Sequence, residues 1–133
     1  MNDTSLMNSL YLKKTKVSPT VDFNCETGVL QLKGRSLPEQ TYELYKPLIE
    51  WMDEYVKNPQ EKTTVNLHLE YINSSSNKYI LLILKKLDDF HKEGKHVEVN
   101  WYYDEEDEDS YDTVNEYKEV LDLPIFLHKE DEE

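Results

Sequence analysis

Two stretches that alternate between apolar and polar side chains flank one helical stripe, and this pattern constrains the fold more than any other feature. In residues 64–72 every second side chain is apolar, and residues 97–103 alternate in the same way. Between them, Gly94 ends a stripe of apolar residues at helical spacing, formed by Tyr79, Ile80, Ile83, Leu84, Leu87 and Phe90. A strand, a helix and a strand of these lengths predict two parallel strands joined by a right-handed crossover.

The polar half of each strand predicts the number of layers. Strands covered by helices on both faces are apolar throughout, whereas these strands each keep one polar face, which carries Asn66, His68 and Glu70 in the first and Glu98, Asn100 and Tyr102 in the second. We therefore expect an α/β fold, a two-layer sandwich with a mixed sheet and helices mainly on one face. The 133 residues suffice for one domain with a single apolar core.

Turn signals and periodicity predict the N-terminal elements. Residues 21–23 and 29–33 are expected to pair as a hairpin with Gly28 in the turn, and Pro19 places the first of these strands near a sheet edge. A helix is predicted over residues 39–57. Within it, Pro47 indicates either a kink or a regular part that begins only a few residues earlier.

The C-terminal part is predicted to hold a third helix and a final strand. Thr113 and Glu116 have the spacing of a capping box, which leaves the start of this helix open. Its apolar stripe runs through Tyr111, Val114, Tyr117, Val120 and Leu121. Pro124 ends the helix, and the segment IFLH that follows is a candidate for a short strand. We expect residues 1–9 to be a flexible N-terminus, residues 10–128 a single domain and residues 129–133 an acidic tail.

The charge balance argues against two classes of partner. The chain has 15 basic and 28 acidic residues, and its formal net charge of −13 repels phosphate backbones and anionic lipid headgroups. We therefore expect no nucleic-acid partner and no membrane partner. The single cysteine, Cys25, cannot form an internal disulfide, and no segment resembles a signal peptide or a transmembrane helix, so we expect a cytoplasmic protein.

No catalytic or metal-binding motif is recognisable, so we expect neither an enzyme nor a cofactor. The histidines, His68, His91, His96 and His128, lack the spacing of zinc ligands, and the three glycines leave no phosphate-binding loop. Cys25 has no basic neighbour in its turn that would activate the thiol. The run DEEDED at residues 104–109 lacks the glycine and the glutamate of a calcium loop, which favours a solvated segment before a helix N-terminus.

Three adjacent serines stand where the first alternating strand meets the following helix. Ser74 or Ser75 is predicted to be the N-cap, whose side-chain oxygen accepts hydrogen bonds from N–H groups of the first turn. Capping alone is the commoner role of such serines. A phosphoryl group at the same position would also be stabilised, because the helix N-terminal amides and the helix dipole favour negative charge.

The segments GRSLPE, NSSS and VNWYYDEEDED follow one another in an order that resembles the family of SiaC-type biofilm-regulation phosphoproteins. The likeness covers nearly all of residues 16–128. The fold of that family is similar to the STAS domains of anti-anti-sigma factors, so the resemblance implies a STAS-like sandwich.

The resemblance also implies a non-enzymatic phosphoprotein of a partner-switching pathway. In the family, the hydroxyl residue directly after the asparagine, usually threonine, is phosphorylated by a dedicated protein kinase and restored by a PP2C-type phosphatase. The unmodified form binds and activates a diguanylate cyclase, so phosphorylation controls cyclic-di-GMP output and biofilm behaviour. The matching position here is Ser74, and because it is a serine, Ser75 stays open as an alternative acceptor.

If the two alternating strands are parallel, their carboxyl ends share one edge of the sheet, and Ser74 lies on the same rim as residues 104–109. We expect this rim to bind the partner through Asn73, Ser74, Ser75, Ser76, Asp104, Glu105, Glu106 and Asp107. A phosphate would add between one and two negative charges to a rim that is already acidic, and so weaken docking.

Other functions stay open on the sequence alone. One is a STAS-like antagonist of an anti-sigma factor, which the protein that co-purifies with the chain would distinguish. Another is a small metal-dependent hydrolase that uses the DEEDED run and His68, which calorimetric titration with Mg²⁺, Mn²⁺ and Ca²⁺ would test. In the simplest case the serines only cap a helix.

Overall fold

The computed structural model describes residues 8–104 and 107–130. In chain order these residues form β1 (Leu10–Leu12), β2 (Thr20–Asn24), β3 (Val29–Ser36), α1 (Thr41–Tyr55), β4 (Lys62–Ile72), α2 (Ser74–Lys92), β5 (His96–Asp104), α3 (Glu108–Val120) and β6 (Ile125–Glu130). The strands lie in one sheet in the order of the sequence, β1-β2-β3-β4-β5-β6.

Strand directions agree with the predictions. β2 and β3 form the expected antiparallel hairpin, with Val21 opposite Leu32, and β1 pairs antiparallel with the other side of β2. From β3 onward every neighbouring pair of strands is parallel, and Leu67 of β4 lies opposite Trp101 of β5. The sheet is therefore mixed, as expected.

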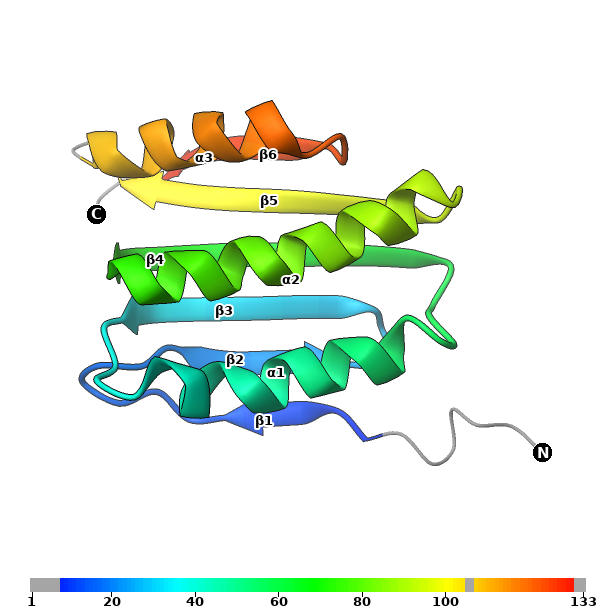
Figure 1. Ribbon diagram of the computed structural model, residues 1–133, viewed down its shortest axis with the longest axis horizontal. Coiled ribbons are helices and arrows are strands. Elements are labelled where there is room, and N and C mark those ends of the chain that lie inside the picture. The colour runs from blue at the N-terminus through cyan, green and yellow to red at the C-terminus, as the bar shows by residue number, and fades with distance from the viewer. Residues whose placement is uncertain (1–7, 105–106, 131–133) are drawn as a thin grey trace.

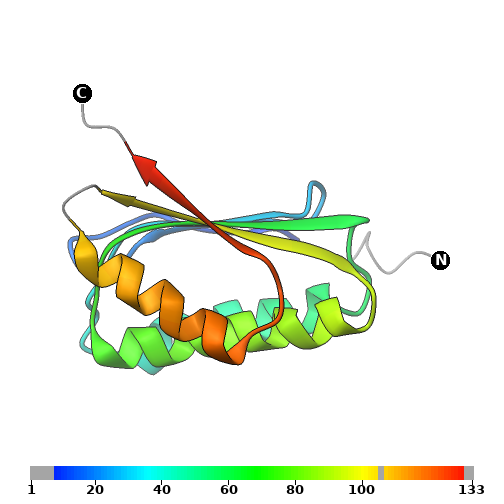
Figure 2. The same cartoon turned by 90° about the horizontal axis from the view of Figure 1, so that it is seen from above.

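All three helices cover the same face of the sheet (Figures 1 and 2). Each helix connects a strand to the next parallel strand in the same direction across the sheet. Because parallel crossovers share one hand, successive crossovers in one direction leave their helices on one face. The prediction of a two-layer α/β fold is confirmed, whereas the likeness to STAS domains stays a prediction.

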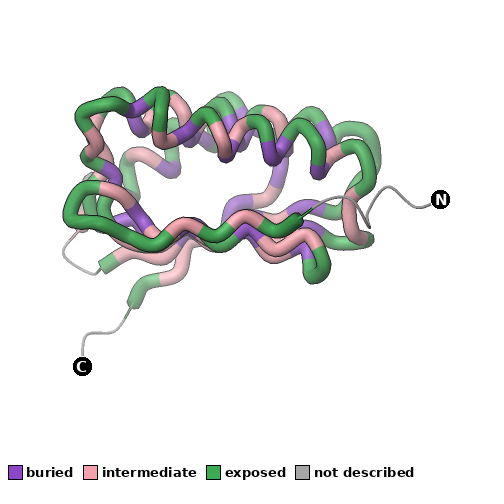
Figure 3. The backbone as a smooth tube through the Cα atoms, turned by 90° about the horizontal axis from the view of Figure 1, so that it is seen from below, coloured by how far each residue is buried: buried purple, intermediate pink, exposed green. Residues whose placement is uncertain are grey.

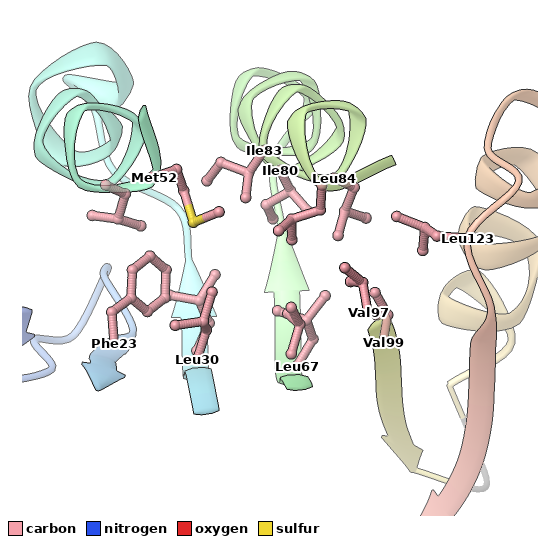
Figure 4. Packing of buried hydrophobic residues seen from close by; sticks show 14 of the residues in the cluster. Phe23, Leu30, Met52, Leu67, Ile80, Ile83, Leu84, Val97, Val99 and Leu123 are labelled. Carbon is pink, nitrogen blue, oxygen red and sulfur yellow. The ribbon is translucent and has the colours of Figure 1, made fainter. Parts of the chain in front are cut away.

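The core lies between the sheet and the helix layer, where the buried positions of both layers face each other (Figure 3). Figure 4 shows how side chains of the two layers interdigitate, among them Phe23, Leu30, Leu67 and Val99 from the strands and Met52, Ile80, Ile83 and Leu84 from the helices. Burying one such side chain contributes about 1.5–3 kcal/mol. The opposite side of the sheet is covered by none of the helices α1, α2 and α3 and is called the open face below.

Gly28 stands in the hairpin turn, as predicted, and its backbone φ is +76°. A Cβ atom at this position would collide with the carbonyl oxygen of Lys62. Glycine is therefore required twice over, by the left-handed conformation and by the close approach of β4.

Several boundaries differ from those expected. α3 begins at Glu108, so Thr113 lies inside the helix and its capping-box spacing with Glu116 does not mark the start. α1 runs continuously from Thr41 through Pro47. By contrast, the expectation that the strand after Pro19 lies near a sheet edge is confirmed, because β1 forms the edge and β2 lies next to it.

The folded domain also extends further toward both ends of the chain than expected. β6 continues through Lys129 and Glu130, two residues that were assigned to an acidic tail. Residues 8 and 9 are held in place, since the indole N–H of Trp51 donates to the carbonyl oxygen of Asn8 at 2.8 Å and the backbone N–H of Cys25 donates to Ser9 Oγ at 3.0 Å. No helix in residues 8–104 and 107–130 is long and apolar enough to cross a membrane.

Candidate functional site

The parallel strands end, and the three helices begin, along one edge of the molecule (Figure 1). We call this edge the carboxyl rim and define it by residues 36–41, 73–77, 104 and 107. The expectation that Ser74 and the start of the acidic run share one edge is confirmed, because β4 and β5 are parallel and end at Ile72 and Asp104.

The cap of α2 is Asn73, and the prediction that Ser74 or Ser75 caps this helix is wrong. Asn73 has extended backbone angles, and its Oδ1 accepts the backbone N–H of Ser76 at 2.9 Å. Asparagine is as good an N-cap residue as serine. Because β4 ends at Ile72 and α2 begins at Ser74, the capping position falls on Asn73. Ser74 is therefore the first residue of the helix.

Asn73 also joins the end of β3 to the start of α2. Its backbone N–H donates to the carbonyl oxygen of Ser36 at 3.0 Å, and its side-chain Nδ2 donates to the carbonyl oxygen of Pro38 at 3.3 Å. Asn73 is thus bound through its backbone and through its side chain to the segment that leads into α1. This fixes the position of the first turn of α2.

Ser76 is fully buried and belongs to a hydroxyl network. Ser36 Oγ donates to Ser76 Oγ at 2.8 Å and lies 2.6 Å from the hydroxyl oxygen of Tyr45. Burial raises the pKa of the Tyr45 hydroxyl, while its hydrogen bonds to Ser36 and Ser76 act in the opposite direction. Ser76 therefore has a structural role.

Ser75 is exposed, but its hydroxyl is occupied. Ser75 Oγ lies 2.7 Å from Thr41 Oγ1 at the start of α1 and donates to Asn73 Oδ1 at 3.4 Å. Thr41 is itself buried. This contact connects the N-termini of the two neighbouring helices.

Ser74 is exposed, and its hydroxyl makes no hydrogen bond with any residue in the described ranges. It is the only one of the three serines with both properties. Asn77, one turn further along α2, accepts a hydrogen bond from the hydroxyl of Tyr117 in α3. Burial, with smaller effects of Tyr45 and Glu116, raises the pKa of the Tyr117 hydroxyl, which therefore stays protonated.

The acidic run is only partly described. Asp104 is the exposed last residue of β5, and the backbone N–H of Asp107 donates to the carbonyl oxygen of Asp104 at 2.9 Å. Glu105 and Glu106, which were expected to contribute to partner binding, lie outside the described residues. The acidic segment leads directly into α3, as the sequence predicted, so carboxylates stand beside a helix N-terminus that favours them.

Sequence reasoning missed the partners of the serines, although one signal pointed to them. Ser36, Pro38 and Thr41 each hydrogen-bond to the NSSS turn, and Tyr45 is joined to it through Ser36. Ser36 and Pro38 belong to the GRSLPE segment. That segment is among the most specific parts of the family resemblance, but its letters alone do not show which side chains it contacts.

A second polar cluster lies on the open face. The rings of His68 and His128 both stack on the ring of Tyr102, with centroid distances of 4.1 and 4.7 Å. His68 Nδ1 lies 3.2 Å from Glu130 Oε2, and His128 Nε2 donates to Asn100 Oδ1 at 2.8 Å. In the part of the chain that the structure describes, no group of three or more histidine, cysteine, aspartate or glutamate side chains could hold a metal ion.

Comparison with known proteins identifies relatives over almost the whole chain. The family model for SiaC family regulatory phosphoproteins matches residues 12–130. An uncharacterised protein of Pseudomonas aeruginosa is 30% identical over 126 residues, which cover 95% of this chain and 100% of the relative.

Solved structures of SiaC from Pseudomonas aeruginosa have the same fold. One superposes with a TM-score of 0.86 at 28% identity and covers 93% of this chain and 100% of that one. Another, the activator SiaC in complex with the diguanylate cyclase SiaD, matches with a TM-score of 0.86 at 29% identity over 91% of this chain and 99% of that one. The chain therefore belongs to the SiaC family of regulatory phosphoproteins.

Proposed function

We propose that the chain is a non-enzymatic regulator whose phosphorylation at Ser74 controls the binding and activation of a diguanylate cyclase. The observation that carries the proposal is the state of the three serines. Ser76 is buried in a hydroxyl network and Ser75 is bound to Thr41, whereas Ser74 is exposed with a hydroxyl that no described residue engages.

The covalent step requires a protein kinase and a nucleoside triphosphate. Ser74 Oγ forms a bond to the γ-phosphorus, the bond from that phosphorus to the bridging oxygen breaks, and the nucleoside diphosphate leaves while the serine proton passes to a base of the kinase. A PP2C-type phosphatase reverses the modification by hydrolysis of the phosphate ester. Because kinase and cyclase both consume nucleoside triphosphates, we propose a cytoplasmic location for the chain.

The charge of the carboxyl rim supports an effect of the phosphate on docking. The helices α1, α2 and α3 all begin at this rim. Each helix N-terminus carries a partial positive charge, which attracts acidic groups of a partner. A phosphoserine carries about −1.5 to −2 charges at pH 7, and it would stand in front of one of these termini on a rim that also holds Asp104 and Asp107. We propose that Asn73, Ser74 and Ser75 contact the partner, and that charge and bulk at Ser74 break this contact.

The cyclase is proposed as partner because of the relatives. In Pseudomonas aeruginosa, SiaC forms a complex with the diguanylate cyclase SiaD as its activator. This chain matches that SiaC at 29% identity over nearly its full length. The corresponding partner here is a diguanylate cyclase of the chain's own host.

The test is reconstitution of the chain with the diguanylate cyclases of its host, with two readouts: the dissociation constant and the rate of cyclic-di-GMP formation from GTP. Ser74→Ala should bind and activate as the unmodified chain does, because a methyl group adds neither charge nor bulk. Ser74→Asp, and more strongly the chain with phosphoserine incorporated at position 74, should lose both.

A matched control separates local from general charge effects. Asn58→Asp adds one negative charge at an exposed residue just beyond the C-terminal end of α1, away from the carboxyl rim, and should leave binding unchanged. Equal binding by Ser74→Ala and Ser74→Asp would refute the switch. Co-purification of an anti-sigma factor in place of a cyclase would redirect the proposal to the other class of partner.

A further inference from the structure

Three consecutive hydroxyl groups at the start of α2 point in three directions. Successive residues of a helix are rotated by about 100°, so adjacent side chains cannot share one environment. Ser76 points into the core, Ser75 toward α1, and Ser74 away from both. Burial excludes Ser76 as a phosphate acceptor but does not distinguish Ser75 from Ser74, because both are exposed.

Hydrogen bonding does distinguish them. Asn73 Oδ1 accepts the N–H of Ser76, which fixes the orientation of the amide, and an amide oxygen can only accept. Ser75 Oγ lies 2.7 Å from Thr41 Oγ1, where either hydroxyl can be the donor, and 3.4 Å from its acceptor Asn73 Oδ1, while Thr41 Oγ1 also has the carbonyl oxygen of Pro38 as an acceptor at 3.4 Å. The proton of the Ser75 hydroxyl is engaged in either arrangement: it goes to Asn73 Oδ1 when Thr41 donates to Ser75, and to Thr41 Oγ1 when Thr41 donates to Pro38.

Thr41 is held firmly enough to act as a fixed partner. It is the first residue of α1, and only 8% of its surface is exposed. One turn later, the ring of Tyr45 stacks on that of Tyr79 in α2, with centroids 5.6 Å apart and planes inclined by 6°. This contact locks the two helix N-termini in register, so Thr41 and Ser75 stay opposite each other.

We propose that Thr41 is a positioning residue that directs phosphorylation to Ser74 by occupying the hydroxyl of Ser75. The inference rests on the proposed function of the chain as a phosphoprotein. Attack on the γ-phosphorus of a nucleoside triphosphate needs a free lone pair on the serine oxygen and a proton that a kinase base can remove. Ser75 must give up its hydrogen bond with Thr41 to meet these conditions, whereas Ser74 breaks none with the described residues.

The isosteric variant Thr41→Val removes the hydroxyl group and keeps the shape of the side chain. Thr41→Ser keeps the hydroxyl group and is the matched control. Each protein is incubated with ATP and an extract of the native cells, and phosphopeptides that contain residues 73–78 are quantified by mass spectrometry. We expect Ser74 to dominate in the unmodified sequence and in Thr41→Ser. In Thr41→Val the ratio of phospho-Ser75 to phospho-Ser74 should rise about fivefold, the factor that one net hydrogen bond represents.

A second measurement does not depend on a kinase. Three-bond Hα–Hβ couplings in NMR spectra report whether Ser75 occupies one rotamer. They should show one rotamer in the unmodified sequence and in Thr41→Ser, and averaging over several rotamers in Thr41→Val. Averaged couplings for Ser75 in the unmodified sequence would overturn the role of Thr41.

The outcomes separate this inference from the proposed function. If Ser74 is phosphorylated in every variant and the ratio to phospho-Ser75 does not change in Thr41→Val, the role of Thr41 is refuted and the proposed function stands. If the extract phosphorylates none of the three serines, the proposed function fails, and the selecting role of Thr41 fails with it.

Discussion

Ser36 Oγ and Ser76 Oγ lie 2.8 Å apart at the buried end of β3 and the start of α2, although 40 positions separate the two residues in the sequence. Both side chains are fully buried, and Ser36 also bonds to Tyr45. The proposed phosphorylation turn is therefore attached to the core by a polar network two residues from the proposed acceptor. Ser76 holds the helix start against the core, while the hydroxyl of the exposed Ser74 makes no hydrogen bond with the described residues.

The first prediction concerns this network. Ser76→Ala leaves Ser36 without one of its partners in a buried site, and the free energy of unfolding should fall by about 1–3 kcal/mol. Ser74→Ala, on the exposed side of the same turn, should change it by less than about 0.5 kcal/mol. Urea denaturation of the two variants checks this, and equal effects would mean that the network contributes nothing to stability.

The second prediction concerns Asp88 and the loss of folding stability at low pH. Its Oδ1 accepts the backbone N–H groups of Asp122 and Leu123 at 2.9 Å each, and Oδ2 lies 3.3 Å from Lys92 Nζ. Burial works to raise the pKa of this carboxyl group, but the two N–H donors and Lys92 outweigh it, so the pKa is lowered. The carboxylate therefore favours the folded state above the unfolded-state pKa of about 3.9, and this stabilisation is lost as the pH falls through the lowered folded-state pKa.

Asp88→Asn removes the charge and keeps the shape of the side chain. We expect a loss of about 1–3 kcal/mol at pH 7 and a flatter dependence of stability on pH between 5 and 3. Asp89→Asn is the matched control, because its side chain is exposed on the same helix. Urea unfolding across this pH range should separate the two variants, and identical profiles would contradict the role of Asp88.

The third prediction concerns Tyr117 and the loss of folding stability at high pH. Its hydroxyl donates to Asn77 Oδ1, and burial raises its pKa above the ordinary value of about 10. A raised folded-state pKa means that the contribution to stability is complete below about pH 10 and is lost as the pH rises toward the folded-state value. Tyr117→Phe should therefore cost about 1–2 kcal/mol at pH 8, and less at pH 11, where the unmodified chain has lost part of this contribution.

Tyr111→Phe is the control for Tyr117→Phe, since Tyr111 lies in the same helix and is half exposed. Its unfolding free energy should follow that of the unmodified chain at every pH from 8 to 11. A constant difference between Tyr117→Phe and the unmodified chain over this range would show that the hydroxyl of Tyr117 does not titrate with unfolding.

The sequence predicted the sheet because its signals there are local. The alternation around Leu67 and Val99 is a property of neighbouring residues, and it indicated two strands with one polar face each. Their parallel direction followed from the order strand, helix, strand and from the length of the connecting segment. These same rules led to the correct rim for Ser74.

The details of the site were not predictable in the same way. Asn73 and Ser74 are equally good caps, and which of them is used depends on where β4 ends against β3. Thr41 lies 34 positions from Ser75, and no local pattern indicates that two helix N-termini meet there. Thr113 and Glu116 satisfied a local capping rule inside a helix that starts earlier.

The last prediction concerns the state of the phosphate itself. On a helix, residues four apart lie on the same face, so a phosphate on Ser74 would stand one turn before the exposed side chain of Lys78. The first turn of α2 carries no acidic residue that would compete for this lysine. An anion placed four residues before a lysine is stabilised by about 0.2–0.5 kcal/mol, which lowers the second pKa of the phosphate, ordinarily about 6, by a few tenths of a unit.

This can be measured by ³¹P NMR titration of the chain with phosphoserine incorporated at position 74. Lys78→Gln should raise the second pKa of the phosphate by a few tenths of a unit. Lys85→Gln removes the same charge from the same helix, but Lys85 lies about 16 Å from Ser74 along the helix axis, beyond the screening length of about 8 Å at physiological ionic strength, so this variant should leave the pKa of the phosphate unchanged. Equal shifts in the two variants would mean that Lys78 is not paired with the phosphate. A lowered pKa would ensure that the group carries close to two charges at neutral pH, which is the condition under which the proposed repulsion at the carboxyl rim is strongest.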